Sequence, residues 1–149
     1  MIDLNNESGV GLDELGLIGV AKFALEQLRI HPQADLSILL VDPGVMEAYH
    51  VKYMDLPGPT DVMSFPMDEL RVPEDDEDPP EGLLGDIVLC PEIITEQAPG
   101  NGRTPDDEAQ YLLIHGLLHL LGYDHAEPAE KAVMFGLNDL IIDAWARKR

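Results

Sequence analysis

The sequence predicts an α+β fold, with one small sheet of about four strands packed with about five helices. Three observations support this prediction. Segments with strand and helix periodicity follow one another in the order β-α-β-α-β-β-α-α-α. A chain of 149 residues has a common length for one domain. Because we find no internal repeat and no second-domain boundary, we expect residues 1–149 to form a single domain.

The first half of the chain supplies two strands and two helices. Residues 2–8 are a short strand candidate that ends in turn-forming residues. Apolar residues recur at helical spacing over 12–30. A buried strand is expected at 34–42, where an apolar and partly β-branched run lies between two prolines. Pro43 then begins a short helix over 43–55, because proline is favoured in the first turn of a helix.

Two further strands enclose an acidic loop. Residues 60–66 and 85–91 alternate in hydrophobicity and end in proline. The loop at 68–82 holds eight acidic residues, one basic residue and three prolines. This composition predicts a flexible, solvated surface loop, and the two strands that it joins are candidates for hairpin neighbours. A short helix over 91–98 follows.

Two longer helices complete the chain. Thr104 is a suitable N-cap and Pro105 a suitable first residue for a helix that ends near Gly122, which fits the left-handed position past a helix end. The last helix begins at Pro128. One apolar stripe on it is expected to face the core: Val133, Leu137, Leu140, Ile141, Ala144 and Trp145.

The composition limits the kinds of protein that this chain can be. Nine Lys and Arg against 29 Asp and Glu give a net charge of −20, which disfavours broad non-specific binding to nucleic acids. The single cysteine, Cys90, cannot form an internal disulfide. The N-terminus lacks the features of a signal peptide, and no apolar run approaches the roughly 20 residues of a membrane span. We therefore expect a cytoplasmic protein without a membrane partner.

The segment HGLLHLLGYDH at 115–125 has the histidine spacing of a zinc site. His115 and His119 are four residues apart on the predicted helix, so both imidazoles project from one face. Gly122 can reverse the chain and bring His125 to the same ion. Three imidazoles with an open fourth position are typical of catalytic zinc. We predict one zinc ion per chain.

This segment lacks the general base of metzincin proteases, which have glutamate where this chain has Gly116. Glycine inside a helix costs about 1 kcal/mol relative to alanine, so Gly116 indicates the close approach of a backbone or a substrate. A methionine turn is also missing, because Met134 lies in a helical pattern. Zinc without that base still activates water and acts as a Lewis acid, which suits phosphodiesters. His31 and His50 stand alone and are interpreted as satisfied core residues.

Three motifs in order resemble the YbeY family of bacterial endoribonucleases: PTDVMSFP (59–66), GLLGDIVLCPE (82–92) and HGLLHLLGYDH (115–125). The resemblance covers nearly the whole chain. It implies a mixed sheet with helices, one of which carries the first two histidines, and it implies that all three histidines are zinc ligands. The implied activity is metal-dependent hydrolysis of single-stranded RNA, in 16S rRNA 3′-end processing and ribosome quality control. The implied partners are an rRNA precursor and the small ribosomal subunit.

Members of this family usually carry an arginine before the strand of the first motif, and that arginine is taken to contact substrate. Lys52 stands at this place and would meet a phosphate as a point charge. Thr60, Asp61 and Ser64 are candidates for the wall of the cleft, with capping and turn hydrogen bonds as their alternative role. Asp124 is either a partner of a ligand histidine or a turn residue.

Two other functions stay open at the level of the sequence. A divergent zinc peptidase would keep the ion and take its base from elsewhere. A non-enzymatic assembly factor would use the metal only to stabilise its fold. Chelator-sensitive hydrolysis of casein would identify the peptidase. The assembly factor would be identified if histidine variants had a lower melting temperature while the wild type hydrolysed no substrate.

Overall fold

A four-stranded mixed sheet forms the centre of the protein, whose computed structural model describes residues 1–148. The strands lie in the order β1-β2-β4-β3. They are β1 (Ile2–Asn6), β2 (Asp35–Leu40), β3 (Val62–Pro66) and β4 (Leu83–Leu89). β2 pairs in parallel with β1 and β4, whereas β3 pairs antiparallel with β4. The predicted mixed sheet is therefore confirmed, and the two strands that flank the acidic loop are neighbours.

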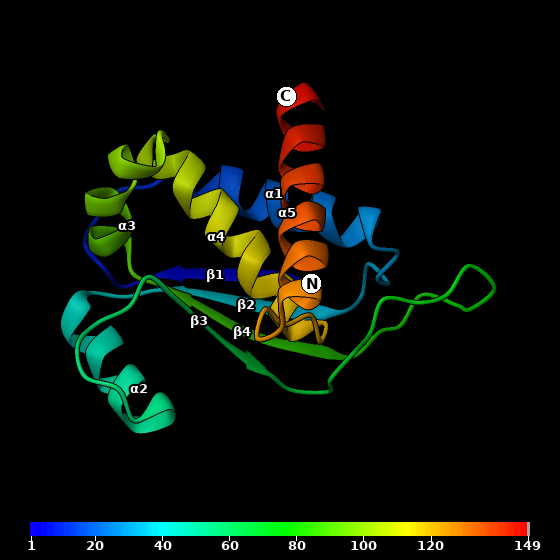
Figure 1. Ribbon diagram of the computed structural model, residues 1–149, viewed down its shortest axis with the longest axis horizontal. Helices are drawn as coiled ribbons and strands as arrows, with labels where there is room; N and C mark the ends of the chain where they lie inside the picture. Colours follow the sequence, from blue (N-terminus) through cyan, green and yellow to red (C-terminus); the bar gives the residue numbers. More distant parts are fainter. Residues whose placement is uncertain (149) are drawn as a thin grey trace.

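Five α-helices and a short 3-10 helix at Pro99–Asn101 complete the described residues. The α-helices are α1 (Glu14–Gln27), α2 (Pro43–Met54), α3 (Pro91–Gln97), α4 (Pro105–Leu120) and α5 (Pro128–Lys148). Figure 1 shows α1, α4 and α5 on one side of the sheet, while α2 projects from the other side. The α+β class and the order of the elements are as the sequence predicts. Within the described residues, no helix has the length and apolar character required to cross a membrane.

Helix α4 is the centre of the core. Thr104 caps it through its Oγ1, which accepts a hydrogen bond from the backbone N–H of Asp107 at 3.1 Å. Gly122, just past its end, has the expected positive φ of 93°. Its buried leucines and isoleucine share one apolar core with α1 and the sheet, and each such side chain contributes about 1.5–3 kcal/mol through burial. This packing fixes α4 firmly over β3 and β4.

The apolar stripe predicted on α5 is partly wrong. Val133 and Leu140 are 59% and 65% exposed, while the buried residues of α5 are Met134, Asn138 and Ile141. The buried face includes a polar residue because the Asn138 amide donates to a backbone carbonyl of α4 at 3.4 Å. A pattern of apolar residues alone leaves such a position out, so the predicted face is rotated around the helix.

The acidic loop between β3 and β4 extends away from the sheet, as Figure 1 shows. Most of it lies at the surface, as expected, but Leu70 and Val72 near its start pack against the core, and the loop is attached to α1. Arg29 donates to the carbonyl oxygens of Glu74 and Glu77, both at 3.0 Å. These two hydrogen bonds hold the far part of the loop against the end of α1.

Candidate metal centre

Three histidine side chains converge at the C-terminal end of α4. His115 and His119 project from one face of the helix, and their Nε2 atoms lie 3.2 Å apart. His125 lies in the segment between α4 and α5, and one ring nitrogen from each histidine lies within 4.8 Å of the others. Two ligands bound tetrahedrally to zinc are separated by about 3.3 Å, given bonds of about 2.0–2.1 Å. The His115–His119 separation matches this value, and the cluster is compatible with a metal site.

The surroundings of the two helical histidines favour the neutral imidazole. Burial, reinforced by the neighbouring His119 and His125, lowers the pKa of His115 to about 4. Burial also lowers the pKa of His119. The Nδ1 of His119 lies 3.0 Å from the carbonyl oxygen of Tyr123, and since a carbonyl only accepts, this nitrogen carries the proton. The Nε2 lone pair of His119 then points toward the cluster, which is the arrangement that metal-binding histidines adopt.

A phenylalanine from α5 packs against two of the three rings. The Phe135 ring stacks on His115 with centroids 5.7 Å apart and on His125 with centroids 6.0 Å apart. Flat packing of this kind restricts the orientation of both imidazoles. This role could not be predicted from the sequence, because Phe135 is one apolar residue among many in a helical pattern.

The histidines line a cavity of about 650 Å³. Its other walls come from α2, from β3 and from the segment between them: His50, Tyr53, Met54, Thr60, Asp61, Val62, Met63, Ser64, Phe65 and Pro66. The three polar candidates for the cleft wall all lie here. Thr60 and Asp61 also make the local hydrogen bonds of their alternative role, whereas Ser64 bonds to another element. Ser64 Oγ donates to the carbonyl oxygen of Gly116 at 3.0 Å. Asp61 Oδ1 accepts from the backbone N–H of Val62 at 2.8 Å.

Gly116 accounts for the closeness of α4 to the sheet. A Cβ atom at this position would lie 3.0 Å from Ser64 Oγ and 3.1 Å from Ile87 Cγ2. The close approach inferred from the sequence is therefore to side chains of β3 and β4. A larger residue would push α4, and the two histidines on it, away from the wall of the cavity.

Neither of the two single histidines is a core residue. His31 is half-buried and lies beside a carboxylate of the acidic loop. His50 is also half-buried, its Nδ1 lies 2.8 Å from the Gly58 carbonyl oxygen, and it lines the cavity. The interpretation of both as core residues is wrong, because His31 lies in the turn region after α1 and His50 lies on a half-buried face of α2 that lines the cavity. Asp124 takes the turn alternative, since its Oδ1 accepts from the backbone N–H of His125 at 2.7 Å.

Lys52 lies in the last turn of α2 with an exposed side chain. Its Nζ is 5.1 Å from the ring centroid of Tyr53. Tyr53 lines the cavity, whereas Lys52 is not among the lining residues. A phosphate contact by Lys52 stays a prediction.

Arg71 is a basic residue that the sequence interpretation missed. Its guanidinium lies over Gly122, close enough to block a side chain there. It lines a hollow of about 290 Å³ that also includes His119 and Pro66. Because His119 and Pro66 line the main cavity as well, the two spaces adjoin. Its position as the one base within an acidic run was the available signal.

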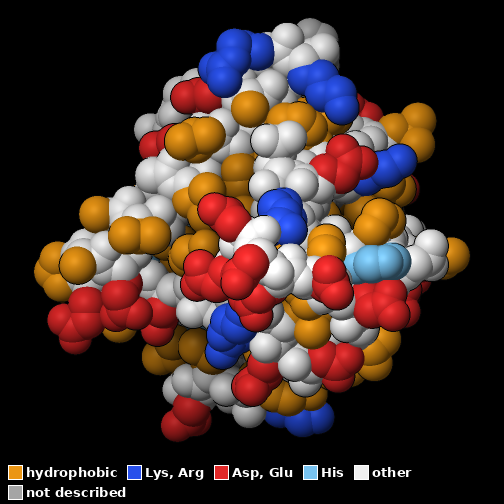
Figure 2. Space-filling model, turned by 90° about the vertical axis from the view of Figure 1, so that its right-hand side faces the viewer, with side chains coloured by type: hydrophobic (Ala, Val, Ile, Leu, Met, Phe, Trp, Pro, Cys, Tyr) orange, Lys and Arg blue, Asp and Glu red, His pale blue; other side chains and the backbone are white. Residues whose placement is uncertain are grey.

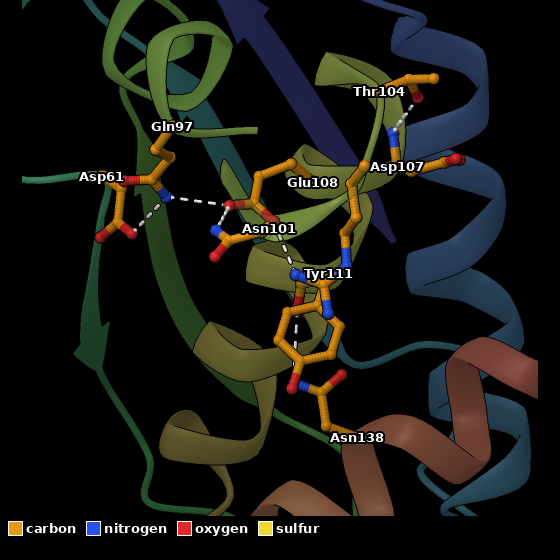
Figure 3. A network of polar contacts seen from close by, with 9 residues as sticks. Asp61, Gln97, Asn101, Thr104, Asp107, Glu108, Tyr111 and Asn138 are labelled. Atoms are coloured by element: carbon orange, nitrogen blue, oxygen red, sulfur yellow. Dashed lines mark hydrogen bonds and ion pairs between the residues drawn. The ribbon is translucent and has the colours of Figure 1, made fainter. Parts of the chain in front are cut away.

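The opposite end of α4 carries a second polar cluster, drawn in Figure 3. Glu108 is 1% exposed. It accepts hydrogen bonds from Arg103 at 2.8 Å, Asn101 at 2.6 Å and Gln97 at 3.1 Å. Gln97 Nε2 also donates to Asp61 Oδ2 at 2.9 Å. Through Gln97, this network also holds Asp61, a residue of the cavity wall, in place.

Known proteins resemble this chain over nearly its full length. The family model Endoribonuclease YbeY matches residues 14–146. The protein named Endoribonuclease YbeY in Cutibacterium acnes is 71% identical over 145 residues, which cover 97% of this chain and 94% of that protein. Its namesake in Streptomyces griseus is 59% identical over 148 residues, which cover 97% and 89%. A solution structure from Thermotoga maritima has the same fold, with a TM-score of 0.64 at 24% identity over 99% of this chain and 91% of that one. The chain belongs to the endoribonuclease YbeY family.

Proposed function

We propose that the protein is a zinc-dependent endoribonuclease specific for single-stranded RNA, and that residues 1–149 form one hydrolase domain. Membership of a family named for endoribonuclease activity supports the reaction class. The observation that carries the metal requirement is the convergence of three imidazoles on one side of an open cavity of about 650 Å³. Three nitrogen ligands with space beside them are typical of catalytic zinc.

Each residue of the centre has a separate task in this proposal. His115, His119 and His125 would hold the ion, which supplies Lewis acidity and activates water when it is bound. The Tyr123 carbonyl keeps the proton of His119 on Nδ1, so that Nε2 is free to bind. Phe135 keeps two of the rings in position. A phosphodiester in the cavity would then face a preorganised set of ligands.

The peptidase alternative lacks a free general base. Among the described residues that line the cavity, Asp61 carries the one carboxylate. Its Oδ1 accepts from the Val62 N–H and its Oδ2 from Gln97 Nε2, so both oxygens are already engaged. Position 116, where a metzincin has its glutamate, faces the sheet with no side chain. Phosphodiester hydrolysis, in which an anionic phosphoryl oxygen binds the metal directly, is better suited to this site.

The surface charge makes the few basic residues near the cavity important. Figure 2 shows the face from which the acidic loop projects, where red side chains gather and blue ones are scattered. With a net charge of −20, the protein repels RNA at long range. We assign phosphate contacts to Lys52, whose Nζ lies next to the Tyr53 ring, and to Arg71, which lines the hollow beside His119. These two cations lie beside different walls of the metal site.

We place the activity in the cytoplasm, in 16S rRNA 3′-end processing and ribosome quality control. The support for this role is the family resemblance together with the charge. A protein that repels free RNA gains from a partner that raises the local concentration of its substrate. The small ribosomal subunit is the partner that fits this requirement.

The test is hydrolysis of a labelled single-stranded RNA by the purified protein, with chelator and with zinc added back. The same RNA in a perfect duplex and casein serve as comparison substrates. We expect cleavage of the single strand alone, lost with chelator and restored by zinc. Chelator-sensitive hydrolysis of casein would instead identify a peptidase. If nothing is hydrolysed and His115→Ala only lowers the melting temperature, the protein is an assembly factor.

A further inference from the structure

The cavity has two chemically different sides. The three histidines, Asp61 and neighbouring hydroxyls form a polar side, and Tyr53, Met54 and Phe65 form an apolar side. A volume of about 650 Å³ lies within the range of roughly 300–1,000 Å³ that small-molecule sites occupy. A ligand that fits such a space has an anionic part next to a flat, apolar part. A nucleotide has this chemistry.

The apolar side is exposed and yet held in place. Tyr53 is 52% exposed and Met54 is 57% exposed. The Tyr53 ring meets Phe65 edge-on with centroids 5.0 Å apart, and Tyr49 lies about equally far from both rings, at 6.1 and 6.2 Å. Edge-to-face contacts of this kind are favourable and orient the rings. Tyr53 is therefore preorganised while much of its surface stays in contact with water.

The charge of the protein shows why such a surface matters for RNA. Proteins that bind single strands combine basic grooves with aromatic side chains on which bases stack. At a net charge of −20 the basic contribution is small, so stacking has to supply much of the local affinity. Bases within a duplex are already stacked and paired, and they cannot lie on a protein ring without being extruded.

Resting on the proposed function, we propose that Tyr53, Phe65 and Met54 form a stacking subsite for one unpaired nucleobase of the RNA strand. The phosphate attached to that nucleotide then lies on the polar side of the same cavity. Lys52, whose Nζ is 5.1 Å from the Tyr53 ring, stands beside the stacked base and can neutralise an adjacent phosphate. Because only an unpaired base can stack there, the subsite would make the metal centre selective for single-stranded RNA.

The test measures binding, separately from cleavage. A single-stranded oligoribonucleotide with nuclease-resistant phosphorothioate linkages is titrated with the metal-loaded protein, either intact or with one base removed at each position in turn. The proteins are wild type, Tyr53→Ala and Tyr53→Phe. The matched control is Val51→Ala, an exposed residue of the same helix that lies outside the cavity lining.

Stacking predicts a coupling between the ring and one base. Tyr53→Ala should weaken binding of the intact strand by roughly 5- to 150-fold, whereas Tyr53→Phe and Val51→Ala should bind like wild type. Removing the base at one position should weaken binding to wild type by a similar factor and leave binding to Tyr53→Ala unchanged. A double-stranded version should show no dependence on residue 53.

Two outcomes overturn the proposal. One is equal binding by wild type and Tyr53→Ala. The other is a loss in Tyr53→Ala that is the same for intact strands and for strands lacking any one base, which is what loosening of α2 would cause. Because cleavage is not the readout, the two hypotheses fail separately: coupling without RNA hydrolysis removes the proposed function alone, and hydrolysis without coupling removes the subsite alone.

Discussion

The two ends of helix α4 carry polar clusters of opposite kinds. At the N-terminal end, Glu108 is buried and its two oxygens accept three hydrogen bonds from neighbouring side chains. At the C-terminal end, His115 and His119 turn their Nε2 atoms toward one another and toward an open cavity. In the first cluster, the hydrogen-bonding capacity of the carboxylate is used by neighbouring side chains. The second leaves lone pairs that only an added cation can use fully.

This difference distinguishes a structural cluster from the candidate metal centre on a single helix. A buried carboxylate that is fully hydrogen-bonded adds rigidity to the fold. Converging imidazoles without such partners gain little from one another unless they bind a metal ion. The helix dipole favours the same arrangement, since it stabilises an anion at the N-terminal end and a cation at the C-terminal end. A change at one end is therefore expected to leave the other end intact.

The largest effect is expected at the open end. His115→Ala should lower the rate of RNA cleavage by at least roughly a thousandfold, because the several kcal/mol that a metal ion contributes are lost. The measurement is single-turnover cleavage of a labelled single strand. His31→Ala is the matched control, since His31 is half-buried but lies outside the cavity lining. A rate within tenfold of wild type for His115→Ala would show that the three-histidine cluster is not the catalytic centre.

A smaller effect, on stability, is expected at the closed end. Glu108→Ala leaves Arg103, Asn101 and Gln97 without their common acceptor, and it should lower the free energy of unfolding by about 2–3 kcal/mol. The exposure of Arg103, one third of its side chain, keeps the loss at the lower end of the range for buried ion pairs. Denaturant unfolding measures it, and metal content should stay unchanged. Loss of the metal without loss of stability would contradict the division of roles.

Gly116 lies in the middle of α4, where the helix packs closely against the sheet. Gly116→Ala should lower the free energy of unfolding by about 1 kcal/mol, because crowding against the sheet outweighs the gain in helix propensity. Gly116→Glu should destabilise the protein more and should not create a peptidase, since the new side chain meets Ser64 and Ile87. Thermal unfolding and a casein assay test both variants. A stable Gly116→Glu protein that hydrolyses casein would refute this account of position 116.

The smallest effect concerns the cations beside the open end. Lys52→Ala should slow RNA cleavage several-fold and flatten its salt dependence by about one counterion, and Lys52→Arg should preserve the rate because its fork matches phosphate oxygens. Arg71→Ala is the companion variant on the other side of the metal site. The measurement is the cleavage rate of each protein over a range of salt concentrations, with metal content checked in each. Three coincident curves for wild type, Lys52→Ala and Lys52→Arg would identify Lys52 as an ordinary surface residue.

The sequence predicted the elements well because their signals are local. Proline at helix starts, glycine after α4 and the spacing of His115 and His119 each depend on only a few neighbouring residues. The order of elements follows from such signals, whereas the mixed pairing of the sheet was implied by the family resemblance. The face of α5 was predicted only in part. Leu137, Ile141, Ala144 and Trp145 belong to or pack against the core as expected, but Asn138 was missed because it is buried through a contact with another helix.

The walls of the site could not be predicted in the same way. Tyr53 and Phe65 reach the histidines from segments some 50 to 70 residues earlier in the chain, and no spacing rule joins residues at such separations. The family resemblance pointed to Lys52 as a substrate contact but not to the neighbouring Tyr53 ring. Arg71 was visible as the one basic residue of the acidic loop, but its place beside His119 depends on how the loop folds back.

The most direct test of the contrast between the two ends is the metal content of matched variants. Elemental analysis of the purified wild type should find about one zinc ion per chain. The His115→Ala/His119→Ala double variant should contain none, while Glu108→Ala should retain the ion despite its lower stability. Full metal occupancy in the double histidine variant would contradict the assignment of the metal centre to the C-terminal end of α4.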